Sequence, residues 1–146
     1  MSSEAETGGV SVFHAHASLR LGTEAVQAAA QRVAEGEGVR WTEVNVILAD
    51  HTLVRDLNRD WLGHDWNTDV VSFPLNDDDA ARGGIEGEVY VDLDTAREVA
   101  PEHGATFEHE ALRYVVHGLL HLAGHDDATN EERAAMRELE DRYLAV

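Results

Sequence analysis

The sequence predicts a single α+β domain, in which a small mixed sheet packs with helices around a central, buried helix that carries two histidines. Its 146 residues amount to one domain, and a hydrophobic fraction of 43% is enough to form a core. Strand-like and helix-like segments mingle without the regular alternation of a doubly wound sheet, and several strands are close enough in sequence to pair antiparallel. Residues 106–123 are apolar almost all round, which is typical of a helix in the middle of a domain.

Apolar residues in short alternating or continuous runs predict four strands. They are expected at residues 10–17, 43–48, 70–73 and 87–94. Residues 1–9 are polar and acidic with nothing to bury, and we expect a disordered tail there. The single domain is therefore expected to span residues 10–146.

Residues that favour the first position of a helix predict where the helices begin. The expected caps are Thr23, Asp50 and Thr129, the last in a capping box with Glu132, and a short helix is expected to begin at Thr95. Glycines are expected to end the first two of these helices, near Gly38 and Gly63.

The chain is strongly acidic. Its 11 basic residues against 29 acidic ones give a formal net charge of −18, and every basic residue is an arginine. Such a surface should repel nucleic acid at ordinary ionic strength. A salt-rich cytoplasm would account for this composition, because the Debye screening length falls to about 3 Å at 1 M salt and charges on the surface then repel one another less. Alternatively, a local patch of arginines beside a functional cleft could bind RNA while the acidic surface lies elsewhere.

The absence of cysteine excludes disulfide scaffolds, thiolate zinc sites and cysteine nucleophiles. Histidine, aspartate and glutamate are then the available metal ligands, and the chain has nine histidines. No apolar run is long enough to span a membrane, and the amino terminus has no apolar signal segment. We therefore expect a soluble, cytoplasmic protein with no membrane partner.

His117 and His121 are four residues apart on the predicted central helix, so both imidazoles project from one face and can reach a common metal. The alternative is that one or both are hydrogen-bonded core histidines. Gly124 can end the helix, after which His125, Asp126 and Asp127 are candidates for a third ligand. On an unbroken helix His125 would lie about 12 Å from His117 along the axis, which is too far for compact ligation.

With the helix broken at Gly124, Asp127 can fold back and complete a set of two nitrogens and one carboxylate, with a position left open for water. Three protein ligands are typical of a catalytic zinc site, whose bound water has a pKa lowered to about 7. Gly118 stands where the zinc metalloprotease motif has its general-base glutamate. The sequence therefore disfavours peptide hydrolysis, and the glycine leaves room for substrate or backbone to come close.

Four segments of the chain carry a resemblance to a known family. They are residues 57–58, 68–74, 87–91 and 117–126, the last reading His-Gly-Leu-Leu-His-Leu-Ala-Gly-His-Asp. From about Val44 to its end, the chain resembles the YbeY family, bacterial metal-dependent endoribonucleases implicated in ribosomal RNA maturation and ribosome quality control.

The resemblance implies a Zn²⁺-dependent enzyme, with one ion per chain and other divalent metals possible, that cleaves single-stranded RNA. Ribosomal RNA precursors and ribosomal proteins are the implied partners, and DNA is not expected. Asp127 stands where the family usually has a third histidine, and its added negative charge should make the metal a weaker Lewis acid. Leu62 stands where the family commonly has an arginine, and Arg55 or Arg59 could replace it.

Other polar residues near these segments are weighed as follows. Thr68, Asp69 and Ser72 are candidates for substrate contact or for capping a turn and strand. Asp126 is expected to orient a ligand imidazole, with capping of the loop as the alternative. Four histidines outside the motif are assigned to the surface, namely His51, His64, His103 and His109.

Three functions compete. The leading one is a metal-dependent endoribonuclease acting in ribosomal RNA processing, with His117, His121 and Asp127 holding a catalytic metal-bound water. The second is a ribosome-assembly binding factor in which the metal mainly holds the end of the helix in place. The third is a metalloprotease or an iron enzyme, opposed by Gly118 and by the lack of a recognisable cosubstrate site.

Overall fold

The computed structural model describes residues 4–63, 69–76 and 84–144. Within them a five-stranded mixed sheet has the order β1-β2-β3-β5-β4. The strands are β1 (Glu4–Thr7), β2 (Val10–His14), β3 (Trp41–Ala49), β4 (Val70–Pro74) and β5 (Ile85–Asp92). The three inner strands are parallel, and β1 and β4 pair antiparallel at the two edges. The predicted α+β class is confirmed.

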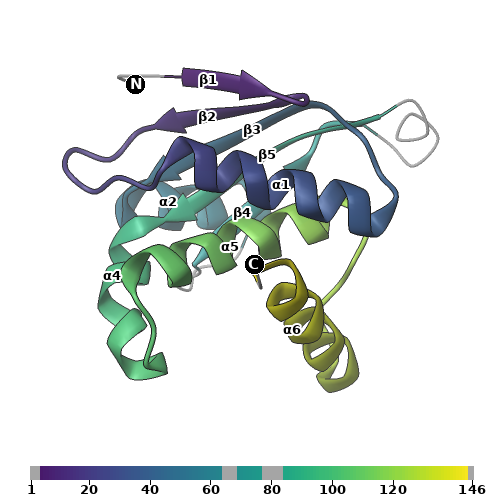
Figure 1. Ribbon diagram of the computed structural model, residues 1–146. Coiled ribbons are helices and arrows are strands. Elements are labelled where there is room, and N and C mark those ends of the chain that lie inside the picture. The colour runs from purple at the N-terminus through teal and green to yellow at the C-terminus, as the bar shows by residue number, and fades with distance from the viewer. Residues whose placement is uncertain (1–3, 64–68, 77–83, 145–146) are drawn as a thin grey trace.

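Helices cover both faces of this sheet. They are α1 (Thr23–Glu37), α2 (His51–Leu62), α4 (Leu93–Val99), the short 3₁₀ helix η1 (Ala100–His103), α5 (Phe107–Leu122) and α6 (Asn130–Leu144). Helices α1 and α5 lie side by side on one face, with α6 against α5, whereas α2 lies behind the sheet (Figure 1). None of the described helices is both long and apolar enough to cross a bilayer.

Strand β3 shows how the two faces are built. Val44, Val46 and Leu48 are fully buried in the main core with α1 and α5. Ile47 and Ala49 point the other way and pack with Val54 of α2 in a smaller core. The alternation of side chains along a strand thus places apolar residues on both faces, as expected for a strand at the centre of a sheet.

The prediction of a disordered tail over residues 1–9 is wrong for residues 4–9. Strand β1 pairs with β2 from Glu4 opposite Phe13 to Thr7 opposite Val10. Gly8 and Gly9 make the connecting turn with φ angles of 58° and 82°. A two-residue turn with positive φ at both positions matches the twist of a hairpin, so this Gly-Gly pair is the signal for the extra strand.

Several element boundaries also differ from the prediction; β3, for example, spans Trp41–Ala49 rather than residues 43–48. Strand β2 ends at His14, before residue 17. Thr23 is the first residue of α1 rather than its cap, which is Gly22. Strand β5 ends at Asp92, whose side chain accepts a hydrogen bond from the Thr95 amide at 2.8 Å, so α4 begins at Leu93. A buried aspartate at the end of a strand can stop the ladder and cap a helix at once.

The other predicted caps are confirmed. Asp50 accepts a hydrogen bond from the Leu53 amide at 2.9 Å. Thr129 and Glu132 form the reciprocal capping box at the start of α6, with both hydrogen bonds 3.0 Å long.

Candidate metal centre

Helix α5 carries the histidine pair through the centre of the molecule. Its N-terminus is capped by the Thr106 hydroxyl, which accepts a hydrogen bond from the His109 amide at 3.1 Å. Gly118 faces the sheet so closely that an added Cβ would lie 2.4 Å from Val89 Cγ1. The Ser72 hydroxyl donates to the Gly118 carbonyl at 3.0 Å. The space at Gly118 is therefore taken by the sheet, and Ser72 ties β4 to α5.

His117 and His121 lie one turn apart on α5, about 60–100° around the helix axis from Gly118. Their ring centroids are 4.7 Å apart and their ring planes are inclined at 72°. The two Nε2 atoms are 3.1 Å apart, so both rings present the same nitrogen to one point.

Asp127 joins the two histidines after the chain reverses at Gly124, where φ is 106°. One Asp127 carboxylate oxygen lies 3.2 Å from His117 Nε2, and the other lies 3.5 Å from His121 Nε2. The Arg133 guanidinium holds this loop by donating to the Asp127 and Ala128 carbonyls at 3.2 and 3.0 Å.

The spacing of these three groups fits a divalent cation. All three ligand atoms lie within 4.8 Å of one another. Two ligands about 2.0–2.1 Å from a tetrahedral zinc are roughly 3.3–3.4 Å apart, close to the distances found here. His117, His121 and Asp127 are therefore the residues that could hold the metal. His125 points elsewhere, with Nε2 2.5 Å from the Glu37 carboxylate on α1.

Glu140 of α6 orients His117. It is only 5% exposed, and its Oε2 accepts a hydrogen bond from His117 Nδ1 at 2.7 Å. Its other oxygen accepts from Arg113 at 2.9 Å, and Arg113 also donates to Asp141 at 2.6 Å. With the proton on Nδ1, the lone pair of Nε2 is directed at Asp127 and His121, as in the carboxylate–histidine–metal arrangement.

Electrostatics at His117 reflect the same contacts. Burial disfavours the charged imidazole, but the hydrogen bond and charge of Glu140, with smaller effects of Asp69 and Asp127, outweigh it and raise the pKa of His117. The carboxylates around this ring thus favour a cationic partner, whether a proton or a metal ion.

A cavity of about 580 Å³ opens beside the three candidate ligands, between α5, α6 and η1. Asp69, at the start of β4, lines it together with His117 and Asp127. Burial, with the nearby carboxylates of Glu140 and Glu110, raises the pKa of Asp69 despite the opposing charge of His117. Asp69 therefore lies in the cavity beside two of the candidate ligands.

The remaining candidates are placed as follows. Asp126 is exposed and contacts neither imidazole in the part of the chain that the structure describes. The contact to a ligand imidazole that was expected of Asp126 is made by Glu140, which binds His117. Thr68 and His64 lie outside the described residues, as does the side chain of Leu62. Arg59 pairs with Asp56 and Asp60 at 3.1 and 2.9 Å, and Arg55 is exposed.

Two of the histidines assigned to the surface, His51 and His103, are half-buried and exposed, respectively, but contact buried carboxylates. His51 Nδ1 is 2.6 Å from Asp92, a fully buried carboxylate that needs a hydrogen-bond donor. His103 Nδ1 is 3.1 Å from Glu110, whose side chain is 3% exposed, and His103 lines the cavity.

Known proteins match this chain over almost its whole length. The sequence model of the family described as Endoribonuclease YbeY matches residues 11–146. The chain belongs to the YbeY family. A protein of that name from Salinibacter ruber is 48% identical over 140 residues, which cover 92% of this chain and 89% of the relative.

Further YbeY relatives agree with this assignment. Endoribonuclease YbeY from Chlorobium luteolum is 40% identical over 80% of this chain and 82% of its own. A solution structure of a Thermotoga maritima protein superposes with a TM-score of 0.59 at 31% identity, covering 91% of this chain and 86% of that one. The fold of that Thermotoga maritima protein is thus similar to the fold of most of this chain.

Glu140 was not predicted as a functional residue, although the sequence contains a signal for it. It follows Met136 by four residues and precedes Tyr143 by three, and both of these are buried on α6. A carboxylate in the apolar stripe of a helix requires a buried partner.

Proposed function

We propose that this protein is a Zn²⁺-dependent endoribonuclease that cleaves single-stranded RNA and acts in ribosomal RNA maturation in the cytoplasm. One observation carries the proposal: two imidazoles and one carboxylate converge, and two of these groups, His117 and Asp127, line an open cavity, in a chain that belongs to the YbeY family. Three protein ligands are typical of a catalytic zinc ion rather than a structural one.

Each residue of the site has a role in this proposal. A zinc ion held by His117, His121 and Asp127 would supply Lewis acidity and a water molecule of lowered pKa. Glu140 keeps the Nδ1 proton on His117 and so fixes the ring. Asp69, with its raised pKa, can hold or accept a proton at its carboxyl oxygen within the same cavity.

The test is cleavage of a defined RNA in single-stranded and duplex form by wild-type protein and by His117→Ala. Wild type should cut only the single strand, and the variant should lose cleavage by at least about 1,000-fold because it loses a metal ligand. A chelator should abolish wild-type cleavage, and added Zn²⁺ should restore it.

A ribosome-assembly binding factor is the second candidate. It is favoured if wild type and His117→Ala bind RNA or ribosomal subunits equally well while neither cleaves. Cleavage that persists in His117→Ala would contradict the proposed site itself.

A further inference from the structure

Arginines are concentrated at the cavity beside the candidate metal centre. Three of the 11 arginines, Arg113, Arg133 and Arg137, line the cavity that also contains His117 and Asp127. The same cavity is lined by the carboxylates of Asp69, Glu110, Asp127 and Glu140, so what each arginine contacts decides which of them can bind a ligand.

Two of these arginines have partners within the protein. Arg113 donates to Glu140 and Asp141 at 2.9 and 2.6 Å. Arg133 donates to the Asp127 and Ala128 carbonyls at 3.2 and 3.0 Å, and to the Asn130 side chain. Both guanidinium groups hold the walls of the site, and these contacts use part of their hydrogen-bonding capacity.

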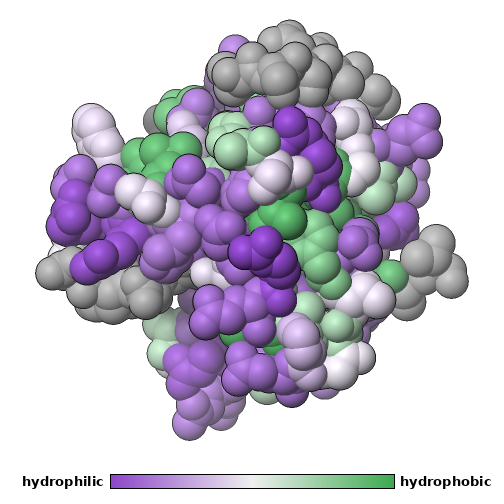
Figure 2. Space-filling view, turned by 90° about the vertical axis from the view of Figure 1, so that its left-hand side faces the viewer, coloured by the Kyte–Doolittle hydropathy of each residue, from purple (hydrophilic) through white to green (hydrophobic). Residues whose placement is uncertain are grey.

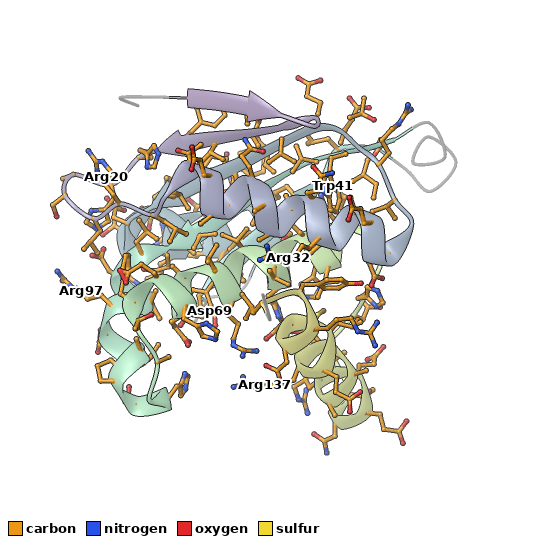
Figure 3. All side chains as sticks on the ribbon, in the orientation of Figure 1. Arg20, Arg32, Trp41, Asp69, Arg97 and Arg137 are labelled. Carbon is orange, nitrogen blue, oxygen red and sulfur yellow. The ribbon has the colours of Figure 1, made fainter. Side chains whose placement is uncertain are left out.

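Arg137 is different. It is exposed and makes no hydrogen bond or close ion pair with any residue in the described part of the chain. Figure 3 shows its guanidinium extending from α6 toward the space beside α4 and η1, on the same side of α5 as Asp69. Its five N–H donors are therefore free for an incoming group.

The position of Arg137 relates it to the metal centre. It follows Arg133, which contacts the Asp127 loop, by one helical turn, or about 6 Å along α6. It also lines a second hollow of about 410 Å³, whose other residues include His103, Thr106 and His109. Arg137 therefore stands where a path from the metal centre leaves the first cavity and enters the second.

The charge balance of the cavity selects the ligand. The carboxylates of Glu140 and Glu110 are already hydrogen-bonded to Arg113, His117 and His103. Asp141, one turn further along α6, is close enough for its charge to interact with Arg137, but its carboxylate is hydrogen-bonded to Arg113. A free, planar guanidinium matches a phosphate group, which it can bind through two parallel hydrogen bonds.

We propose that Arg137 binds a backbone phosphate of the RNA strand, one that neighbours the phosphate at the metal centre. This subsite rests on the proposed function, because it assumes RNA as the substrate. The strand then runs from His117 and Asp127 past Arg137, between η1 and α6, and the acidic remainder of the surface stays clear of it.

The test compares Arg137→Gln with Arg97→Gln, a matched control that removes the same charge from an exposed arginine on α4, away from α6 (Figure 3). Affinity for a single-stranded RNA oligonucleotide is measured by fluorescence anisotropy over a KCl series, and KM and kcat are measured for its cleavage. Arg137→Gln should weaken binding about fivefold and flatten the slope of log K against log [KCl] by about 0.7, the value for one phosphate contact on a single strand.

KM should rise with kcat nearly unchanged, because the contact exists in both the ground and transition states. Arg137→Lys should recover most of the salt slope, and Arg97→Gln should match wild type within about twofold. Thermal unfolding midpoints of all three variants should equal that of wild type, which separates binding from folding.

Equal affinity and equal salt slope in Arg137→Gln and Arg97→Gln, with wild type still cleaving RNA, would overturn the subsite and leave the proposed function intact. Wild-type protein that neither binds nor cleaves the oligonucleotide would overturn both.

Discussion

Glu140 joins the metal centre to α6 through a single side chain. Because its carboxylate accepts the Nδ1 proton of His117, Glu140→Gln should lower the affinity for the metal by about 10–100-fold. Competition with a chelator of known affinity measures this loss. Glu138→Gln is the control, since Glu138 lies on the same helix and is exposed.

A loss of metal affinity in Glu138→Gln as large as in Glu140→Gln would show that the overall charge of α6 matters, and not the contact to His117.

The histidine pair and Asp127 could be predicted because their spacing on a helix and around a glycine fixes which side chains can meet. Glu140 and Arg137 could not be found in this way, since they reach the site through the packing of α6 on α5. That packing depends on contacts distant in sequence, such as the Arg113–Glu140 ion pair.

At the scale of elements, Gly118 sets how closely α5 approaches the sheet. Gly118→Ala should lower the free energy of unfolding by about 1–3 kcal/mol, because the new Cβ overlaps Val89. Urea unfolding measures the change. In a Val89→Ala background the cost should shrink, since the contacting methyl groups are gone.

A rise in the free energy of unfolding of Gly118→Ala would contradict this expectation. Alanine is favoured over glycine in a helix by about 1 kcal/mol, so a stabilised Gly118→Ala variant would mean that α5 can move away from the sheet.

Glu37 connects α1 with α6 and with the loop after α5. Burial disfavours its charge, but hydrogen bonds from Tyr143 and His125 outweigh this and hold the pKa of Glu37 below its usual value. A lowered carboxyl pKa stabilises the fold above the unfolded-state pKa of about 4.3, and the effect disappears as pH falls through the folded-state value.

Glu37→Gln should therefore cost about 1–2 kcal/mol at pH 7 and much less near pH 3. Urea unfolding at both values measures this difference, with Glu35→Gln as an exposed control on the same helix. A cost that is constant with pH would show that packing, rather than the charge of Glu37, is responsible.

Element order was more predictable than element boundaries. The central helix and the alternating strand β3 follow from periodicity, which local sequence records directly. Leu93 was assigned to a strand because it continues the alternation of Val89 and Val91, yet Asp92 ends the ladder by capping α4. The same residues can either continue the strand or begin the helix, so the local sequence does not decide between the two. Tertiary packing decides which of them forms.

For the whole molecule, net charge is the dominant feature. The face on the α4 side is covered mainly by hydrophilic residues, with hydrophobic ones in small groups (Figure 2). Because the net charge is −18, self-repulsion should weaken the fold in dilute buffer. The thermal unfolding midpoint should rise by several degrees from dilute buffer to molar KCl, because the Debye screening length falls to about 3 Å and the self-repulsion is screened.

RNA cleavage should respond in the other direction if the arginines at the cavity dominate binding, because bound phosphates release counterions. Initial rates and unfolding midpoints over one KCl series separate the two effects. A midpoint that is flat or falls with KCl would contradict adaptation to high salt.

Metal content of the purified protein tests the central claim most directly, namely that His117, His121 and Asp127 hold one divalent ion per chain. Elemental analysis of wild type should give one equivalent of metal. His121→Ala should lose it, Asp127→Ala should retain it only weakly, and His125→Ala should keep it, because His125 pairs with Glu37 instead. Full occupancy in Asp127→Ala together with loss in His125→Ala would contradict the site described here.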